Sequence, residues 1–370
     1  MPFPGVKVDI GNGNLLANIN VPDAVPAIVG NGELKAVSVL YGADDFPAGG
    51  MEAGRQAVEE FYREVGGRTM LLYTEYGEQG ELEQALERVW KYSGAVNLMA
   101  VVGYCSFGSP RFEGDEALAQ DIIELVPVLK AKLEARQASG HPVRLFLPGY
   151  YTVLGEGIAY EAKSAGNGYV AIVLGNADGG KEPAVGVALG RATKVAAHVK
   201  IGDGTVGALS IGDVSFGMYG NTKSYDEVGE GEVEVWHDKG YLTFMRRAGL
   251  EGWYFGVDNM CSNDDFSTLA HGRVIDKAQR IAIAAYMPYV ETPMQMADDG
   301  TIDIADAESM AKVIESQLRA QMSGQVSNVK VVVPTAQDLV NTHTLRVSVS
   351  VLPLGYNTWI SVEMDLVSRL

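Results

Sequence analysis

The residues best placed for phosphate chemistry lie in the segment VAIVLGNADGGKEPAVG, residues 170–186. Gly175, Gly180 and Lys181 have the spacing of a phosphate-binding loop, after an apolar segment and before a possible helix. Such a loop needs a hydroxyl group directly after its lysine to hold magnesium, but this chain has Glu182 there, followed by a proline. A carboxylate at that position would repel the phosphates of a nucleotide. We therefore interpret DGGKEP as a solvated turn, and keep a nucleotide-binding α/β enzyme that uses Gly175 to Lys181 as an alternative.

The other residue types that could do chemistry form no recognisable site. Cys105 and Cys261 are far apart in the sequence, and Cys105 ends an apolar segment without the signature of a catalytic nucleophile, so we expect two thiols and no disulfide. The acidic stretches 263–266 and 297–300 lack the ligand alternation of a calcium loop. None of the five histidines has a second histidine or a cysteine at metal-ligand spacing: His141, His198, His237, His271 and His343. The sequence therefore predicts no catalytic residue, no cofactor and no metal site.

The charge of the chain excludes several classes of partner. The 370 residues carry a net charge of −18, and no basic tract interrupts this excess. Binding to nucleic acid or to an anionic membrane would work against like-charge repulsion. The sequence contains no apolar run near the roughly 18 residues of a membrane helix, and MPFPGVKVDI lacks the basic flank of a signal peptide. We expect no nucleic-acid partner, no membrane insertion, and assembly in the cytoplasm.

Apolar and amphipathic segments alternate between Leu34 and Ala197, which indicates the elements that must position any site. Buried strands are expected at 35–42, 68–77, 97–105, 143–148 and 169–175, and helices at 51–66, 81–94 and 117–140. Asp115 is the expected N-cap of the long third helix, and Pro127 predicts a kink within it. Near-continuous apolar strands alternating with amphipathic helices are typical of a mostly parallel sheet covered on both faces. The sequence predicts a doubly wound α/β central domain.

The last third of the chain has a different pattern. Helices are expected at 266–290 and from Asp306 to Gly324, with a short hairpin or turn between them at 297–304. Strands are expected at 329–334, 345–353 and 359–367, the last two joined by the turn LGYNT. Both of these strands place apolar side chains on one face: Leu345, Val347, Val349 and Val351 in the first, and Ile360, Val362, Met364 and Leu366 in the second. We predict an α+β domain of two helices and an antiparallel sheet.

This C-terminal third resembles that of a known family. The sequence GWYF at 252–255, the helix opening RVIDKA at 273–278, the turn marked by Pro334, Gln337 and Asp338, and the closing pair of alternating strands occur in the same order in contractile tail sheath proteins of bacteriophages and related contractile injection systems. AVGVALGRA at 184–192 and PGV at 4–6 fit that family more loosely. The resemblance is good over residues 249–370 and weak between Ala36 and Tyr150.

The resemblance implies a structural subunit with no catalysis and no cofactor. Sheath subunits polymerise into a helical tube around an inner tail tube protein, meet baseplate and tail terminator proteins at its ends, and contract to drive the tube through an envelope. Their location would be a virion tail or an injection particle, assembled in the bacterial host cytoplasm. A shell or tube protein of another, non-contractile kind would share the acidity and the lack of a cofactor, and remains a second alternative.

The resemblance also implies which segments link the subunits. Terminal strands of sheath subunits add to the sheet of a neighbour by main-chain hydrogen bonds. In this chain the linking strands would be GVKVDI, with Val6, Val8 and Ile10, and WISVEMDLV, with Ile360, Val362, Met364 and Leu366. Without the resemblance, the simpler interpretation is that each strand completes its own subunit's sheet. The expected organisation is an N-terminal arm at 1–30, an α/β domain at 31–260, and a sheath-like domain at 261–370.

Overall fold

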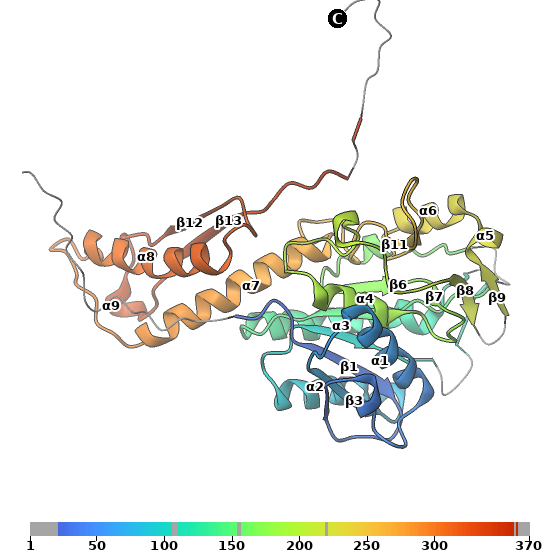
Figure 1. Cartoon of the computed structure of the whole chain (residues 1–370). Helices are drawn as coiled ribbons and strands as arrows, with labels where there is room; N and C mark the ends of the chain where they lie inside the picture. Colours follow the sequence, from blue (N-terminus) through green and yellow to red (C-terminus); the bar gives the residue numbers. More distant parts are fainter. Residues whose placement is uncertain are drawn as a thin grey trace, which may run out of the picture.

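The structure is a computed structural model that describes residues 21–105, 110–114, 116–153, 157–218, 221–358 and 360–361. Its centre is a six-stranded sheet with the strand order β2-β3-β1-β4-β5-β6 (Figure 1). The edge strand β2 is antiparallel to β3, and all the other neighbours are parallel. The strands are β1 (Pro26–Asn31), β2 (Ser38–Leu40), β3 (Leu71–Tyr76), β4 (Leu98–Val101), β5 (Arg144–Pro148) and β6 (Val170–Val173).

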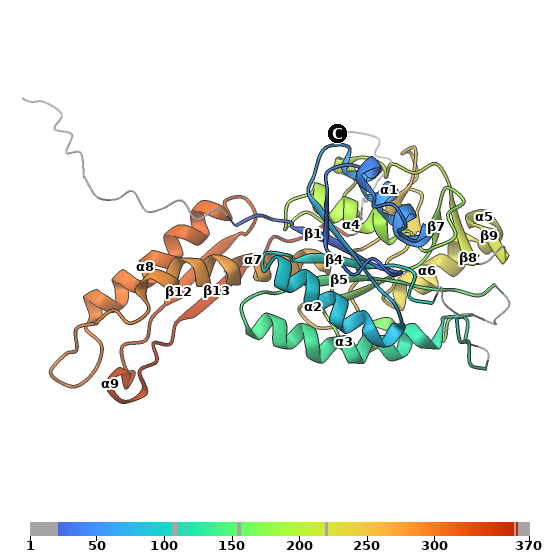
Figure 2. The ribbon, with the colours of Figure 1, turned by 90° about the horizontal axis from the view of Figure 1, so that it is seen from below.

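Helices cover both faces of this sheet. Helices α1 (Glu52–Val65) and α4 (Val185–Lys194) pack against each other on one face. Helices α2 (Leu82–Tyr92) and α3 (Gln120–Ala138) lie on the opposite face (Figure 2). The predicted mixed α/β fold with a mostly parallel sheet is confirmed, since its buried strands required cover on two sides.

Two boundaries expected from the sequence are wrong. The arm expected at 1–30 overlaps β1, whose six residues are all buried between β3 and β4. Helix α3 begins at Gln120 and not directly after position 115. The intervening residues pair with another segment instead, because the N–H groups of Ala117 and Ala119 donate to the carbonyl oxygens of Gly157 and Tyr150.

Small elements extend the central body beyond β6. Strands β7 (Asn176–Ala177), β8 (Val214–Met218) and β9 (Asn221–Ser224) form an antiparallel sheet, followed by α5 (Tyr225–Val228) and α6 (Glu230–Asp238). Strands β10 (Phe244–Met245) and β11 (Tyr254–Phe255) form an antiparallel pair. The short 3-10 helices are η1 (Ala43–Asp45), η2 (Gln79–Glu81), η3 (Ala162–Ala165), η4 (Gly204–Val206) and η5 (Met287–Tyr289). The buried indole of Trp236 packs against the rings of Phe216 and Tyr151, joining these elements to the main core.

The last third forms a unit that projects from the central body (Figures 1 and 2). Helix α7 (Leu269–Tyr286) begins in the central body and runs into this unit, where it packs against α8 (Ile304–Gln321). Strands β12 (Asn328–Val332) and β13 (Ser348–Leu352) form an antiparallel pair, and α9 (Leu339–Thr342) lies between them in the chain. Two helices and an antiparallel sheet are therefore confirmed here. Helix α8 begins two residues before the expected Asp306, because the side chain of Asp303 caps it.

Alternation in β13 follows the prediction, and β12 alternates as well. Val329, Val331 and Val333 are buried beneath α7 and α8, with the core side chains Ile281, Ile314 and Leu318. The residues adjacent in sequence to the four apolar residues predicted to share a face are exposed. The four themselves are all partly buried: Leu345, Val347, Val349 and Val351. One face of the pair is thus covered, and the other is exposed.

The turn expected at LGYNT is wrong. Residues 353–357 have no regular structure, and Thr358, a bend, makes a local hydrogen bond from its N–H to the carbonyl oxygen of Tyr356 at 3.1 Å. The chain does not reverse there but continues from β13 alongside α7 towards the central body (Figure 1). There the hydroxyl group of Tyr356 donates to the carbonyl oxygen of His198 at 2.6 Å. The path of the chain here thus follows a long-range contact and not the hairpin turn that glycine and asparagine suggested.

Most of the expected linking-strand residues lie outside the described residues: Val6, Val8, Ile10, Val362, Met364 and Leu366. Ile360 is described; it belongs to no strand and its side chain is 78% exposed. Their pairing therefore stays a prediction. Separately, no helix in the described part of the chain is both long and apolar enough to cross a membrane.

Candidate functional site

The turn from Gly175 to Lys181 does not present its lysine to a phosphate site. The side chain of Lys181 is exposed, and its backbone N–H donates to Gln56 Oε1 at 3.0 Å. Glu182 is buried, and the hydroxyl group of Tyr150 donates to its carboxylate at 2.6 Å. Burial raises the pKa of Glu182 above its ordinary value. The prediction of a wholly solvated turn is therefore wrong at Glu182, which anchors the turn to the sheet.

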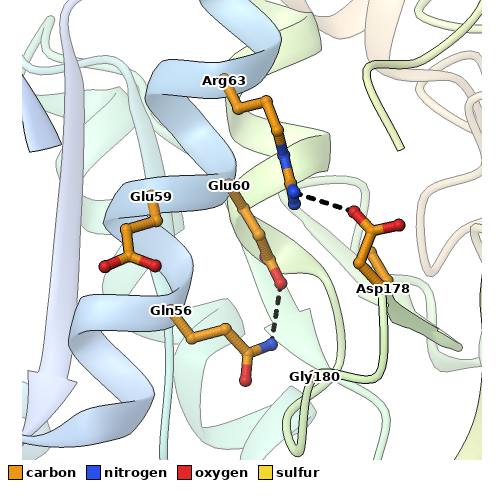
Figure 3. Close-up of a pocket in the computed structure, with 7 residues that line it drawn as sticks. Gln56, Glu59, Glu60, Arg63, Asp178 and Gly180 are labelled. Carbon is orange, nitrogen blue, oxygen red and sulfur yellow. Dashed lines mark hydrogen bonds and ion pairs between the residues drawn. The ribbon is translucent and has the colours of Figure 1, made fainter. Parts of the chain in front are cut away.

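A cavity of about 220 Å³ lies between α1 and this turn (Figure 3). Three carboxyl groups line it, those of Glu59, Glu60 and Asp178, against the single guanidinium group of Arg63. Arg63 is already paired with Asp178 at 2.8 Å. Burial raises the pKa of Glu60 to about 8, and this effect exceeds the lowering by the hydrogen bond from Gln56 and by the charge of Arg63. An anionic phosphate has no favourable partner in this cavity.

The usual ligand position of a doubly wound sheet is also occupied by the protein. Ligands of such sheets bind beyond the carboxyl ends of the strands where the strand order reverses, beside the first helix N-terminus. Here Glu75 accepts hydrogen bonds from the N–H groups of Met51, the N-cap of α1, and Leu34, each at 2.9 Å. The hydroxyl group of Tyr73 donates to the same carboxylate at 2.6 Å. An internal carboxylate thus fills the place that a phosphate would take.

Neither the two cysteines nor His237 is placed for catalysis or metal binding. Cys105 and Cys261 are buried, and burial raises the pKa of both thiols, that of Cys261 to about 12. Thiols with raised pKa values are poor nucleophiles at neutral pH. Nε2 of His237 accepts the N–H of Val257 at 2.9 Å. Within the described ranges, no three histidine, cysteine or acidic side chains are grouped so that they could hold a metal ion.

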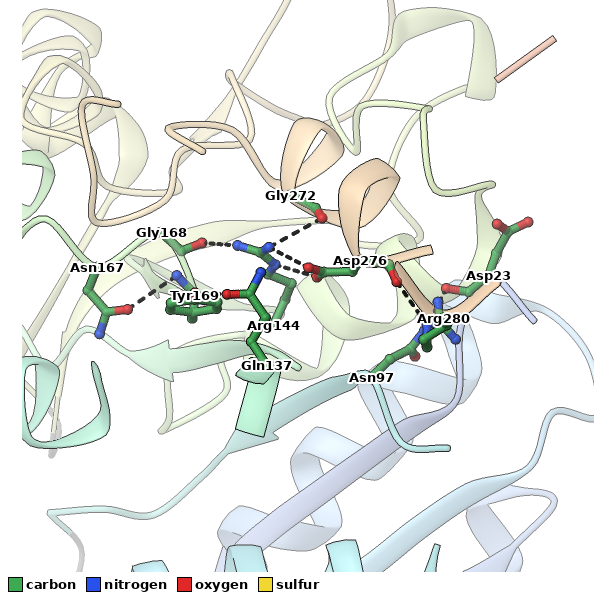
Figure 4. Close-up of polar contacts among 10 residues, drawn as sticks. All are labelled: Asp23, Asn97, Gln137, Arg144, Asn167, Gly168, Tyr169, Gly272, Asp276 and Arg280. Carbon is green, nitrogen blue, oxygen red and sulfur yellow. Dashed lines mark hydrogen bonds and ion pairs between the residues drawn. The ribbon is translucent and has the colours of Figure 1, made fainter. Parts of the chain in front are cut away.

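The most developed polar cluster joins α7 to the central sheet. Arg144 on β5 donates to both oxygens of Asp276 on α7, at 2.6 and 2.7 Å (Figure 4). It also donates to the carbonyl oxygens of Gly168 and Gly272, at 2.5 and 3.2 Å. Both side chains are at most 3% exposed. This pair was not predicted from the sequence, because periodicity indicates only the apolar stripe of the helix; the sole signal was a charged run, RVIDKA, within a helix that buries its opposite face.

Further polar contacts hold the same stretch of α7. Lys277 donates to Asp23 at 2.8 Å and to Gln325 at 3.1 Å, so it joins the segment before β1 to the chain after α8. Arg280 donates to the carbonyl oxygen of Pro22 at 3.0 Å. Arg273, which is buried, donates to the carbonyl oxygen of Val195 at 3.0 Å. Helix α7 is thus fixed on the central body along its first half and carries the projecting unit on its second half.

The sheet of the projecting unit has open edges. In the described part of the chain β12 and β13 pair only with each other. A two-stranded sheet is marginal by itself, and its unpaired N–H and C=O groups are a template for a further strand. The outer face is mostly polar, with Lys330, Ser348 and Ser350 exposed. Of the surfaces described, this sheet edge is the candidate site for a linking strand.

Comparison with known protein families and solved structures shows which fold this chain shares. The model of the family described as DUF2586, C-terminal domain, matches residues 265–370. No curated protein sequence matches the chain. Among solved structures, the contracted helical sheath of the anti-feeding prophage is 15% identical with a TM-score of 0.65, covering 99% of each chain.

Two more solved structures have the same architecture. The contracted sheath complex of the extracellular contractile injection system PVC is 13% identical with a TM-score of 0.65, over 100% of this chain and 99% of that one. The sheath tail protein of Desulfitobacterium hafniense is 9% identical with a TM-score of 0.53, over 95% of this chain and 100% of that one. The chain therefore has the fold of contractile sheath proteins, the family that its sequence resembles.

Proposed function

We propose that this protein is the structural subunit of a contractile sheath, polymerising into a helical tube around an inner tail tube. The observation that carries the proposal is the match of the whole chain, not of one domain, to the helical sheath of the anti-feeding prophage. The open edges of β12 and β13 supply the place where linking strands would pair. We assign these strands to GVKVDI and WISVEMDLV, at the two ends of the chain.

The mechanism follows from repetition of one contact. Each subunit of a helical lattice makes the same heterologous contact with its neighbours, so the lattice can store work as a metastable extended state. Contraction releases this work when subunits rotate and repack while the strand links keep them connected. The buried ties of α7 would keep each subunit rigid during that rotation, because Arg144 and Asp276 bind both parts of the molecule.

The partners would be copies of this chain, an inner tail tube protein, and baseplate and tail terminator proteins. One structural neighbour belongs to the baseplate of the anti-feeding prophage, which supports an end of the tube that meets a baseplate. The location would be the tail of a virion or an injection particle, assembled in the cytoplasm of the bacterial host. A nucleotide-binding enzyme has less support, since Glu75 occupies the N-terminus of α1 and acidic side chains line the cavity beside the glycine-rich turn.

The experiment that tests the function removes a linking strand. We expect deletion of residues 1–10 to leave a folded monomer that forms no tubes, because the described core does not include these residues. Light scattering and negative-stain microscopy measure the two properties. Val362→Pro should have the same effect, since proline cannot donate to the strand ladder, whereas the control Val362→Thr keeps the donor. Tubes of normal length and diameter from the deleted protein would remove the proposed role of GVKVDI.

A further inference from the structure

Tyr356 is the point at which the segment after β13 attaches to the central body. Its hydroxyl group donates to the carbonyl oxygen of His198 at 2.6 Å. Its ring lies 5.5 Å from the ring of His271, between centroids, and Nζ of Lys200 lies 4.8 Å from the Tyr356 ring centroid. The receiving residues come from two elements, the loop after α4 and helix α7. Three different contacts thus converge on one side chain.

The surface that receives Tyr356 is held in place by the central body. Lys200 lies 3.7 Å from Asp258, a carboxylate that is 1% exposed and also accepts the N–H of Ala270 at 2.8 Å. Partial burial beside Asp258 raises the pKa of Tyr356 to about 12, so its hydroxyl group keeps its proton and remains a donor. By contrast, Gly355 and Asn357 are exposed on either side of the partly buried Tyr356. The attachment therefore depends on Tyr356 more than on the surrounding chain.

The attachment decides where the chain goes after β13. A strand that paired with the free edge of its own β13 would need the chain to reverse direction within a few residues of Leu352. The chain instead runs from β13 towards the central body (Figure 1). Tyr356 contacts the central body there, and Ile360 is exposed. We propose that Tyr356 is a positioning residue that holds the C-terminal segment away from β13 of its own subunit, so that this edge stays open for a strand of a second copy.

This inference rests on the proposed function, in which a strand from a second copy must reach the edge of β13. An attachment point is then needed, because a strand of the same chain competes for that edge. A strand joined to β13 by a few residues would compete for that edge at an effective concentration on the order of millimolar. A strand from another copy competes only at the concentration of the protein. Without an attachment point, self-pairing would therefore close the edge before a neighbour could reach it.

The test compares Tyr356→Ala with wild type in the full chain, below the concentration at which tubes form. The readout is hydrogen exchange of the β13 amides, whose protection depends on whether a strand pairs with the free edge. Exchange in β13 should become slower, because the released segment pairs with its edge. Tyr356→Phe keeps the ring contacts and should lie between the two. Tyr41→Ala, an exposed tyrosine in a loop, is the matched control.

Tube formation provides the second measurement. We expect Tyr356→Ala to form fewer tubes than wild type at equal concentration. Unchanged exchange in β13 would overturn the inference, whatever the variant assembles into. If exchange changes as expected but wild type itself forms no tubes under any condition, the attachment stands and the proposed sheath function fails.

Discussion

Single carboxylates determine what the glycine-rich turn and the sheet can bind. Glu182 follows Lys181 where a phosphate loop would place a magnesium ligand, and it is bonded to Tyr150 inside the protein. Glu75 binds the N–H of Met51, at the position of α1 that a phosphate would otherwise occupy. The sheet has a topology suited to nucleotides, but Glu75 occupies its phosphate position and Glu182 replaces the hydroxyl group that would hold magnesium.

The exposure of Lys181 leads to a prediction at this scale. Lys181→Ala should leave the free energy of unfolding within about 0.5 kcal/mol of wild type, because an exposed lysine in a turn contributes little. Tube formation should also be unchanged. Calorimetric titration with magnesium and ATP is expected to show no saturable binding in either protein. Saturable binding that Lys181→Ala abolishes would return the enzyme alternative to first place.

The buried ion pair of Arg144 and Asp276 leads to a second prediction about single residues. Asp276→Asn should reduce the free energy of unfolding by about 3 to 5 kcal/mol, because it leaves the guanidinium group buried without its counter-charge. Urea denaturation measures this loss. The control is Glu124→Gln, since Glu124 pairs with Arg111 on the surface, where an ion pair contributes about 1 kcal/mol or less. Equal effects of the two substitutions would mean that Arg144 is not effectively buried.

At the scale of elements, the periodicity of apolar residues predicted correctly those faces of helices and strands that pack on a core formed by adjacent elements. The alternation from Leu345 to Val351 predicted the covered face of β13 correctly, because the partners of these side chains are the adjacent helices. Strand β1 was not predicted, since PAIVGN is short, contains proline and glycine, and resembles a linker. Its identity as a central strand depends on pairing with β3 and β4, which local sequence does not encode.

The apolar stripe of α7 can be tested at the same scale. Ile281 is fully buried in the cluster that joins α7, α8 and β12, so Ile281→Ala should cost about 2 to 4 kcal/mol. Ile283→Ala is the matched control, because that side chain is 38% exposed on the same helix. Thermal unfolding should show a lower midpoint for the first variant only, and tube formation should fail with it. An unchanged midpoint for Ile281→Ala would mean that the covered face of α7 is misplaced.

At the scale of the whole molecule, the sequence predicted the class of fold but not its long-range ties. The order of GWYF, RVIDKA and the closing strands was enough to predict a sheath-like fold, which the solved structures confirm. The contacts of Lys277 with Asp23 and of Tyr356 with His198 join residues 254 and 158 positions apart. Neither contact has a local signature, because a polar side chain in a helix or a tyrosine in a loop is ordinarily solvated. The two C-terminal helices and the β12–β13 pair could be predicted, whereas the contact of Tyr356 with the central body could not.

The net charge gives the last prediction, which concerns assembly. Each copy carries a charge of −18, so bringing copies into a tube concentrates negative charge along the lattice. Salt shortens the Debye length from about 10 Å at 0.1 M to about 3 Å at 1 M, whereas main-chain hydrogen bonds between strands are affected much less. The lowest protein concentration that forms tubes should therefore fall as sodium chloride rises.

Light scattering with negative-stain microscopy over about 0.05 to 0.5 M sodium chloride would measure this dependence. The protein lacking residues 1–10 separates the two possible effects of salt. If salt only reduced repulsion between linked copies, the deleted protein would stay monomeric throughout, whereas general salting-out would make it scatter as well. A minimum tube-forming concentration that rises with salt would mean that charge pairs between copies, and not strand links, hold the lattice together.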